Sequence, residues 1–254
     1  MHFIKCTFLA IVLGCFALGE HSHAQENTPV PGAQVEMKLK VADGAVVDYL
    51  LYLPKTFKVN GPKKFGLMIF LHGSGESEGP LSIVANWGPP MMAARGDDLP
   101  WVIVSPQCPK EDEWESDIQQ KRIAELLDSV VENHNIDEKK IYLTGLSMGG
   151  CGCWRMAADH PNRFAAVAPI CGVGDPADAE KLKDVRIWAF HGDQDSAAPF
   201  QNSVKMVTAI KAAGGKSIRF TSFEHIGHNC WSATYATPEL YKWMEKQESP
   251  AQQK

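Results

Sequence analysis

The stretch "YLTGLSMGGCGCW", residues 142–154, places a single serine, Ser147, between glycines two positions before it and two positions after it. An apolar run precedes this serine and small residues follow it. Because glycine lowers the stability of strand and helix interiors, glycines gathered around one serine indicate a backbone under steric pressure. The pattern predicts a strand that turns sharply into a helix at Ser147, where larger neighbours would collide with the adjoining strand and helix.

The rest of the chain alternates short apolar runs with helical patterns. Runs that are continuously apolar are typical of strands covered on both faces, and they occupy residues 65–73, 100–107, 140–145, 164–172, 185–192 and 217–224. Residues 118–134, 201–215 and 237–247 have helical periodicity. Residues 35–41 and 46–54 alternate around Asp43-Gly44, which predicts an opening antiparallel hairpin. We therefore predict an α/β fold, a mostly parallel sheet with helices on both faces, whose ligands bind outside the carboxyl ends of the strands.

The two ends of the chain differ from its body. Residues 1–24 contain a lysine, an apolar run too short to span a bilayer, and Ser22-His23-Ala24, which predicts a signal peptide cut after Ala24 and a secreted or periplasmic protein. The alternative is a lipoprotein signal, with a lipid anchor at Cys15. We expect residues 25–34 to be a flexible segment, 35–247 to form one domain and 248–254 to be a disordered tail.

Composition narrows the classes of partner. The chain has 254 residues and a formal net charge of -5, which gives no support to binding of nucleic acid or of anionic membranes. We expect no stable membrane insertion once the leader is removed. Five cysteines follow the leader, an odd number that leaves at least one unpaired, and the sequence does not name a disulfide. Cys151 and Cys153 lie too close together for the usual zinc spacing, so we expect no metal and no cofactor.

A serine hydroxyl becomes a nucleophile only when a base takes its proton and an acid orients that base. Asp193 and Asp195 follow the strand at 185–192, and His225 and His228 follow the strand at 217–224. The order serine, aspartate, histidine is the one expected of this kind of turn. We predict His228 as the base, because it follows Gly227 in the loop, where it can swing over Ser147, whereas His225 lies directly at the end of the strand.

Six segments between residues 35 and 245 together carry a family resemblance: "FLHGSGE", "SPQCP", "IYLTGLSMGG", "PICGVGD", "AFHGDQDSAAP" and "GHNCW". With them the chain resembles the α/β-hydrolases, in particular secreted esterases related to dienelactone hydrolases, feruloyl esterases and polyhydroxybutyrate depolymerases. The resemblance implies that residues 35–247 form an α/β-hydrolase catalytic domain. Where this family often has an arginine after "HGSGE", the chain has Ser77-Glu78.

The resemblance also implies roles for single residues. The acid is the second aspartate of the "HGDQD" segment, Asp195, and the base is the histidine of the "GH" pair, His228. Asp193 is the alternative acid, although it is well placed to stabilise its turn, and Glu224 comes next. The oxyanion hole is formed by the backbone N–H groups of Ser74 and Met148.

Aromatic residues suggest where a substrate binds. Trp87, Trp114 and Trp231 lie on predicted loops at the carboxyl end of the sheet, and Trp87 and Trp231 are the candidates for a substrate-binding wall. The connection at 172–186 is short, so we expect no large lid and an open cleft.

We therefore expect a secreted serine carboxylesterase that works through an acyl-enzyme. Its substrate is a small-molecule or polymer-linked ester, with feruloyl or acetyl esters of plant polysaccharides among the candidates. The alternatives are a serine peptidase of the prolyl-oligopeptidase type and a non-catalytic binding domain. Labelling by a fluorophosphonate separates enzyme from binding domain, and a panel of ester and peptide substrates separates the two enzymes.

Overall fold

The computed structural model describes residues 28–249. The predicted signal peptide, residues 1–24, and the alternative anchor at Cys15 lie outside this range, as do the last residues of the predicted tail. Among the described residues, no helix has the length and apolarity needed to cross a bilayer.

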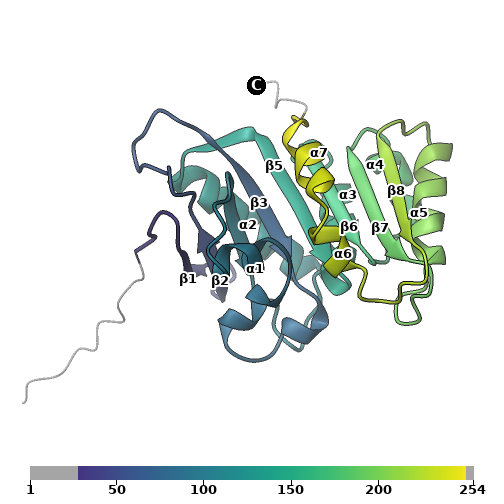
Figure 1. The fold of residues 1–254 in the computed structure, drawn as a ribbon, viewed down its shortest axis with the longest axis horizontal. Coiled ribbons are helices and arrows are strands. Elements are labelled where there is room, and N and C mark those ends of the chain that lie inside the picture. The colour runs from purple at the N-terminus through teal and green to yellow at the C-terminus, as the bar shows by residue number, and fades with distance from the viewer. Residues whose placement is uncertain (1–27, 250–254) are drawn as a thin grey trace, which may run out of the picture.

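The described chain forms an eight-stranded sheet in the order β1-β2-β4-β3-β5-β6-β7-β8 (Figure 1). β1 pairs antiparallel with β2 and β2 antiparallel with β4, whereas the other neighbours are parallel. The strands are β1 (Gln34–Lys40), β2 (Val46–Tyr52), β3 (Phe65–Leu71), β4 (Val102–Pro106), β5 (Ile136–Leu146), β6 (Ala166–Ile170), β7 (Ile187–Gly192) and β8 (Ile218–Phe223). The predicted α/β-hydrolase fold, with its opening hairpin and mostly parallel sheet, is confirmed.

Helices fill the connections between the strands. They are α1 (Gly88–Ala94), α2 (Asp117–Asn133), α3 (Met148–Asp159), α4 (Ala179–Leu182), α5 (Gln201–Ala212), α6 (Trp231–Tyr235) and α7 (Pro238–Glu245), with 3-10 turns η1 (Ser74–Glu76), η2 (Leu81–Asn86) and η3 (Pro176–Asp178). The three helices predicted from periodicity appear as α2, α5 and α7. Between β6 and β7 the chain forms only η3 and α4, in keeping with the short connection that the sequence predicts.

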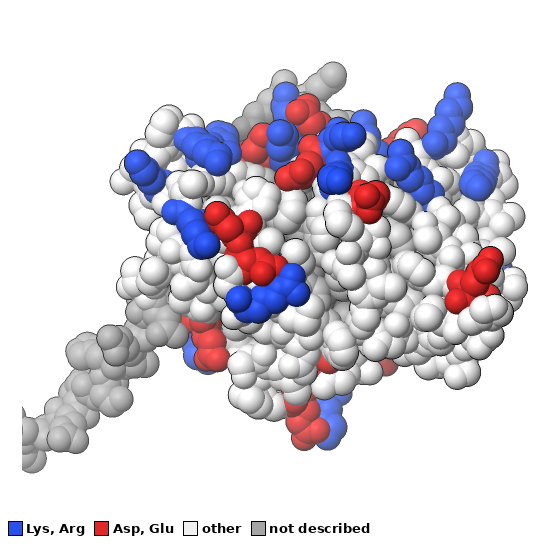
Figure 2. Space-filling model, in the orientation of Figure 1, with Lys and Arg blue, Asp and Glu red and all other residues white. Residues whose placement is uncertain are grey.

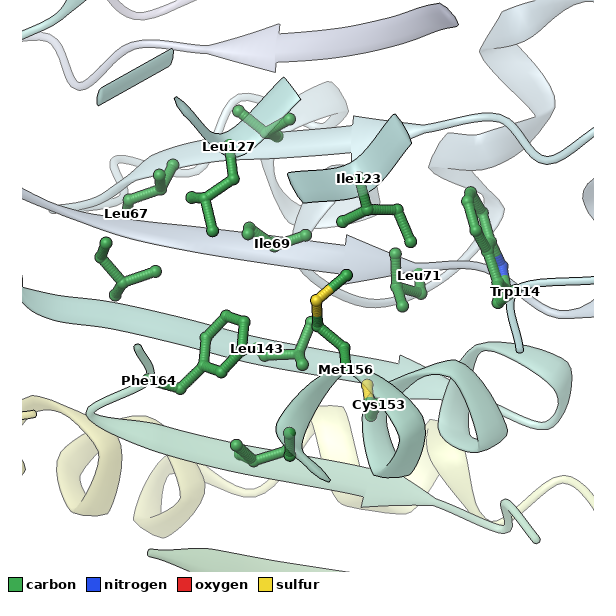
Figure 3. Packing of buried hydrophobic residues seen from close by; sticks show 14 of the residues in the cluster. Leu67, Ile69, Leu71, Trp114, Ile123, Leu127, Leu143, Cys153, Met156 and Phe164 are labelled. Atoms are coloured by element: carbon green, nitrogen blue, oxygen red, sulfur yellow. The ribbon is translucent and has the colours of Figure 1, made fainter. Parts of the chain in front are cut away.

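The strand β3 shows why its sequence is continuously apolar. Leu67, Ile69 and Leu71 belong to one buried cluster, together with side chains of α2 and α3 (Figure 3). Side chains of α5 join the same cluster. Met68 and Phe70 point to the other face and join a second cluster with side chains of α1 and α7. Both faces of the sheet are therefore covered, and every position of the strand is favoured as apolar.

Candidate active site

Ser147 lies between β5 and α3 in a strained backbone conformation, with φ of 53° and ψ of -118°. A Cβ added at Gly145 would lie 2.5 Å from the carbonyl oxygen of Gly149, and one added at Gly149 would lie 2.0 Å from that of Leu71. The flanking glycines are therefore required by close backbone contacts, as the sequence predicts. The N–H of Ser147 donates to the carbonyl of Ile170 (2.9 Å) and ties the turn to β6.

Three of the predicted residues come together in one line of hydrogen bonds. Ser147 Oγ lies 2.9 Å from His228 Nε2, and His228 Nδ1 lies 2.7 Å from Asp195 Oδ2. An ionised carboxylate only accepts hydrogen bonds, so Nδ1 carries a proton and Nε2 of the neutral imidazole is left as the acceptor for the serine hydroxyl. This geometry can transfer a proton from the serine to the imidazole.

The carboxylate of Asp195 is held in place by the turn after β7. Its Oδ1 accepts from the N–H groups of Ala197 and Ala198, each at 2.9 Å, which leaves Oδ2 facing His228. Burial raises the pKa of Asp195, but the hydrogen bonds from His228 and from these backbone groups outweigh it, so the pKa lies below its ordinary value. The carboxylate therefore stays ionised and can stabilise a charged imidazole.

The structure gives the alternative residues other places. Asp193 accepts the N–H of His225 (2.8 Å) and so links the loop after β7 to the loop after β8. The ring of His225 is exposed and its Nδ1 lies 3.2 Å from the side-chain amide of Gln194. Glu224 is exposed.

The two predicted oxyanion donors each begin a helix. Ser74 is the first residue of η1 and Met148 the first of α3, so their N–H groups have no acceptor within their own helices. The loop that carries Ser74 lies against the serine, because a Cβ added at Gly73 would be 3.6 Å from the Cβ of Ser147. Ser74 and Met148 therefore both adjoin the nucleophile, one through Gly73 and the other as the next residue in the chain.

His72 holds the loop after β3, which carries Ser74, from the protein interior. It is fully buried, its Nε2 accepts the N–H of Cys108 (2.9 Å), and its Nδ1 consequently donates to the carbonyl of Gly73 (2.6 Å). Burial lowers the pKa of His72 to about 4, although the hydrogen bond to Gly73 opposes the shift. His72 is thus a neutral residue that links the loops after β3 and β4.

This buried imidazole predicts a fall in stability on acidification. The folded protein holds His72 neutral down to about pH 4, whereas the unfolded chain protonates it below its ordinary value of 6.5. The contribution of neutral His72 to the free energy of unfolding is therefore fully present above pH 6.5. It decreases as the pH falls toward 4, by about 3 kcal/mol at most. Urea unfolding at several pH values tests this. The free energy by which wild type is more stable than His72→Gln should shrink as the pH is lowered from 6.5 to 4. A difference that does not change with pH would contradict the assignment.

The tryptophans divide into two groups. Trp87 and Trp231 are partly buried and their rings meet edge to face, 5.9 Å apart, while Trp231 meets the ring of His228 at 5.2 Å. Trp114 is 1% exposed and donates its indole N–H to the carbonyl of His72 (2.9 Å), so it is a core residue and lies outside any substrate wall. Trp87 lies in the bend between η2 and α1, whereas Trp231 is the first residue of α6 and so is not on the loop that the sequence predicted.

Three residues near the site were not singled out by sequence reasoning. His191 Nε2 lies 3.1 Å from Asp195 Oδ2, and Glu76 contacts both Gly73 and Trp87. The Sγ of Cys171 lies within 4.8 Å of a carboxylate oxygen of Asp195 and of a ring nitrogen of His228. The only sequence signal for Glu76 is a carboxylate that directly follows a glycine-rich turn, and a buried cysteine has none. All five cysteines of the described chain are free thiols.

Comparison with known proteins gives the same fold. A family model described as alpha/beta hydrolase fold matches residues 68–212. The chain is 25% identical over 173 residues to the bifunctional acetylxylan esterase/xylanase XynS20E of Neocallimastix patriciarum, which covers 64% of this chain and 23% of that protein. It is 44% identical over 50 residues to poly(3-hydroxyalkanoate) depolymerase C of Paucimonas lemoignei, which covers 20% of this chain and 12% of that protein.

A solved structure of a thermostable esterase superimposes with a TM-score of 0.73 at 30% identity, covering 85% of this chain and 63% of that one. The matched part of the chain spans less than a quarter of the length of either of the two curated relatives, the acetylxylan esterase/xylanase and the depolymerase.

Proposed function

This chain belongs to the α/β-hydrolase fold family, and from that premise we propose that it hydrolyses carboxylic esters through an acyl-enzyme formed on Ser147. The observation that carries the proposal is the unbroken line of hydrogen bonds from Ser147 Oγ through His228 to Asp195, at 2.9 and 2.7 Å. Enzymes activate a serine hydroxyl with this arrangement.

Each step of the proposed reaction uses one of these three side chains. His228 Nε2 takes the proton of Ser147 as Oγ forms a bond to the ester carbonyl carbon, and the carbonyl electrons move to its oxygen. His228 then gives the proton to the departing alcohol as the C–O bond breaks. In the second half, His228 takes a proton from water as the water oxygen bonds to the acyl carbon. His228 then returns this proton to Ser147 Oγ as the bond between Oγ and the acyl carbon breaks and the acid leaves. Asp195 holds Nδ1 and stabilises the imidazolium formed in both halves.

The negative oxygen needs donors that are fixed before the reaction begins. We assign this role to the N–H groups of Met148 and Ser74, each the first residue of its helix. Donors preorganised in this way are worth a few kcal/mol each, because they require no rearrangement as charge develops.

The acyl group is proposed to lie against Trp87 and Trp231. The ring of Trp231 meets that of His228, and Trp87 packs edge to face against Trp231, so the two indoles form an aromatic surface that begins beside the base. The short connection between β6 and β7, which contains only η3 and α4, favours access for large acyl groups. Feruloyl or acetyl esters of plant polysaccharides combine an ester with a large carrier.

Charge around the site favours an uncharged ester. Within the described chain, Lys110 is the only Lys or Arg in the loops that follow β3, β4, β6, β7 and β8, whereas each of these loops has an Asp or Glu (72–80, 107–116, 171–178, 193–200 and 224–230). Figure 2 shows that on this side of the molecule Lys and Arg gather along the edge where α7 ends. An excess of acidic residues in these loops disfavours anionic substrates and favours release of the acid product.

We expect esters to be cleaved at least about 100-fold faster than matched amides, because an amide also requires protonation of a poor amine leaving group. The measurement is kcat/KM on acetyl and feruloyl esters, an acyl ester that carries a carboxylate, and matched peptide amides. Aromatic acyl groups should be favoured and the anionic ester disfavoured. Faster cleavage of the amides would instead support a peptidase.

Export is a further part of the proposal and rests on the sequence of residues 1–24 alone. N-terminal sequencing of the mature protein tests it. The expected first residue is Gln25, whereas a mature chain beginning at Cys15 would support the lipid-anchored alternative.

A further inference from the structure

The buried carboxylate of Glu76 joins two parts of the site. Glu76 ends η1 and is 7% exposed. Its Oε2 accepts the N–H of Gly73 at 3.1 Å, and its Oε1 accepts the indole N–H of Trp87, also at 3.1 Å. Its backbone carbonyl accepts the side-chain amide of Gln107 at 2.9 Å, which ties η1 to the loop after β4. One side chain therefore uses each of its oxygens for a different segment.

Both segments lead directly to the reacting atoms. Gly73 lies against Ser147 and immediately precedes Ser74, whose N–H is proposed to bind the oxyanion. Trp87 contacts Trp231, which contacts the ring of His228. A shift of the Glu76 carboxylate would move an oxyanion donor on one side and the aromatic wall on the other.

We propose that Glu76 is a positioning residue that sets the oxyanion loop and the tryptophan wall relative to each other, an inference that rests on the proposed esterase function. Its chemistry is specific to a carboxylate. Both partners are hydrogen-bond donors, so the position requires two acceptor oxygens, and an ionised carboxylate provides them. A glutamine provides one oxygen and one NH₂ group, so either Gly73 N–H or Trp87 Nε1–H would face another donor.

This donor conflict makes a prediction that a general loss of packing would not. Glu76→Gln should lower kcat by about 10- to 100-fold, the size of effect expected from misplacing a donor by a fraction of an ångström to one ångström. The KM for a small acetyl ester should change little, because an acetyl group has little apolar surface to place against the two tryptophans. Trp87→Phe keeps a ring but removes the donor, so it should mainly raise KM for bulky aromatic acyl esters.

The two changes should also be coupled. In the Trp87→Phe background the glutamine can turn its oxygen to Gly73 without facing the indole N–H. Adding Glu76→Gln to Trp87→Phe should therefore lower kcat by less than about threefold. Glu78→Gln is the matched control, because Glu78 is exposed, lies two residues away and pairs with Lys110 (2.6 Å). It should keep wild-type kinetics.

The experiment measures kcat and KM of these variants on acetyl and feruloyl esters, with circular dichroism to establish folding. Glu76→Gln activity equal to that of Glu78→Gln, or an equal loss in both backgrounds, would overturn the proposal. If Glu76→Gln fails to fold but the double variant folds, the donor conflict is supported. If neither folds, the carboxylate acts independently of Trp87 and the proposal fails. A wild-type protein that neither cleaves esters nor reacts with a fluorophosphonate would instead refute the proposed function itself.

Discussion

Replacing Ser147 with alanine is expected to lower kcat/KM for esters by roughly three orders of magnitude or more. The hydroxyl is the atom that His228 Nε2 contacts at 2.9 Å, and alanine leaves the imidazole with no proton to accept. The fold should persist, because the N–H of Ser147 holds the turn to β6 and alanine retains that group.

Two observations complete this test. Circular dichroism and urea unfolding should show a native-like variant, although the positive φ at this position also strains alanine. A folded Ser147→Ala protein with near wild-type esterase activity would exclude Ser147 as the nucleophile.

Replacing Asp195 with asparagine is expected to lower kcat by about 1,000-fold or more, with a smaller change in KM. Asparagine can present its NH₂ group to His228 Nδ1, which then becomes an acceptor and leaves the proton on Nε2, facing the serine. The imidazole would be in the tautomer that cannot take the hydroxyl proton. The backbone bonds from Ala197 and Ala198 should still hold the side chain, since the amide oxygen can accept them.

The matched control is Asp193→Asn, on the same turn. Asp193 accepts one backbone N–H, from His225, and asparagine retains an acceptor oxygen for it. Its kcat should stay within about threefold of wild type. Equal, mild losses in the two variants would mean that another group orients His228.

The sequence predicts those parts of the fold in which the structure imposes a recognisable local pattern of residues. The glycines around Ser147 mark the sharp turn, because any side chain at those positions would collide with backbone. Both faces of β3 are covered, so its apolar run is continuous and easily recognised. The approximate positions of Asp195 and His228 follow because parallel strands end at one edge of the sheet.

Other features depend on tertiary contacts that no local pattern reports. β5 begins at Ile136, before the charged segment Asp137–Lys140 that hides its first residues from a search for apolar runs. α1 begins with Gly88-Pro89-Pro90, a sequence typical of a loop, although proline is tolerated in the first turn of a helix. Trp114 lies in an acidic segment that is typical of an exposed loop, yet its ring is buried and packs against that of His72. The two bonds of Glu76 join residues that only the fold brings together.

The most direct test of the account is to identify which atom reacts covalently. The wild-type protein, Ser147→Ala and His228→Gln are each treated with an aryl fluorophosphonate, and the adduct is located by intact-mass measurement and peptide mapping. We predict one adduct on Ser147 of the wild type, slow labelling of His228→Gln because the base is lost, and no adduct on Ser147→Ala. An adduct on another residue, or an unlabelled wild-type protein, would contradict the assignment of Ser147 as the nucleophile of a serine esterase.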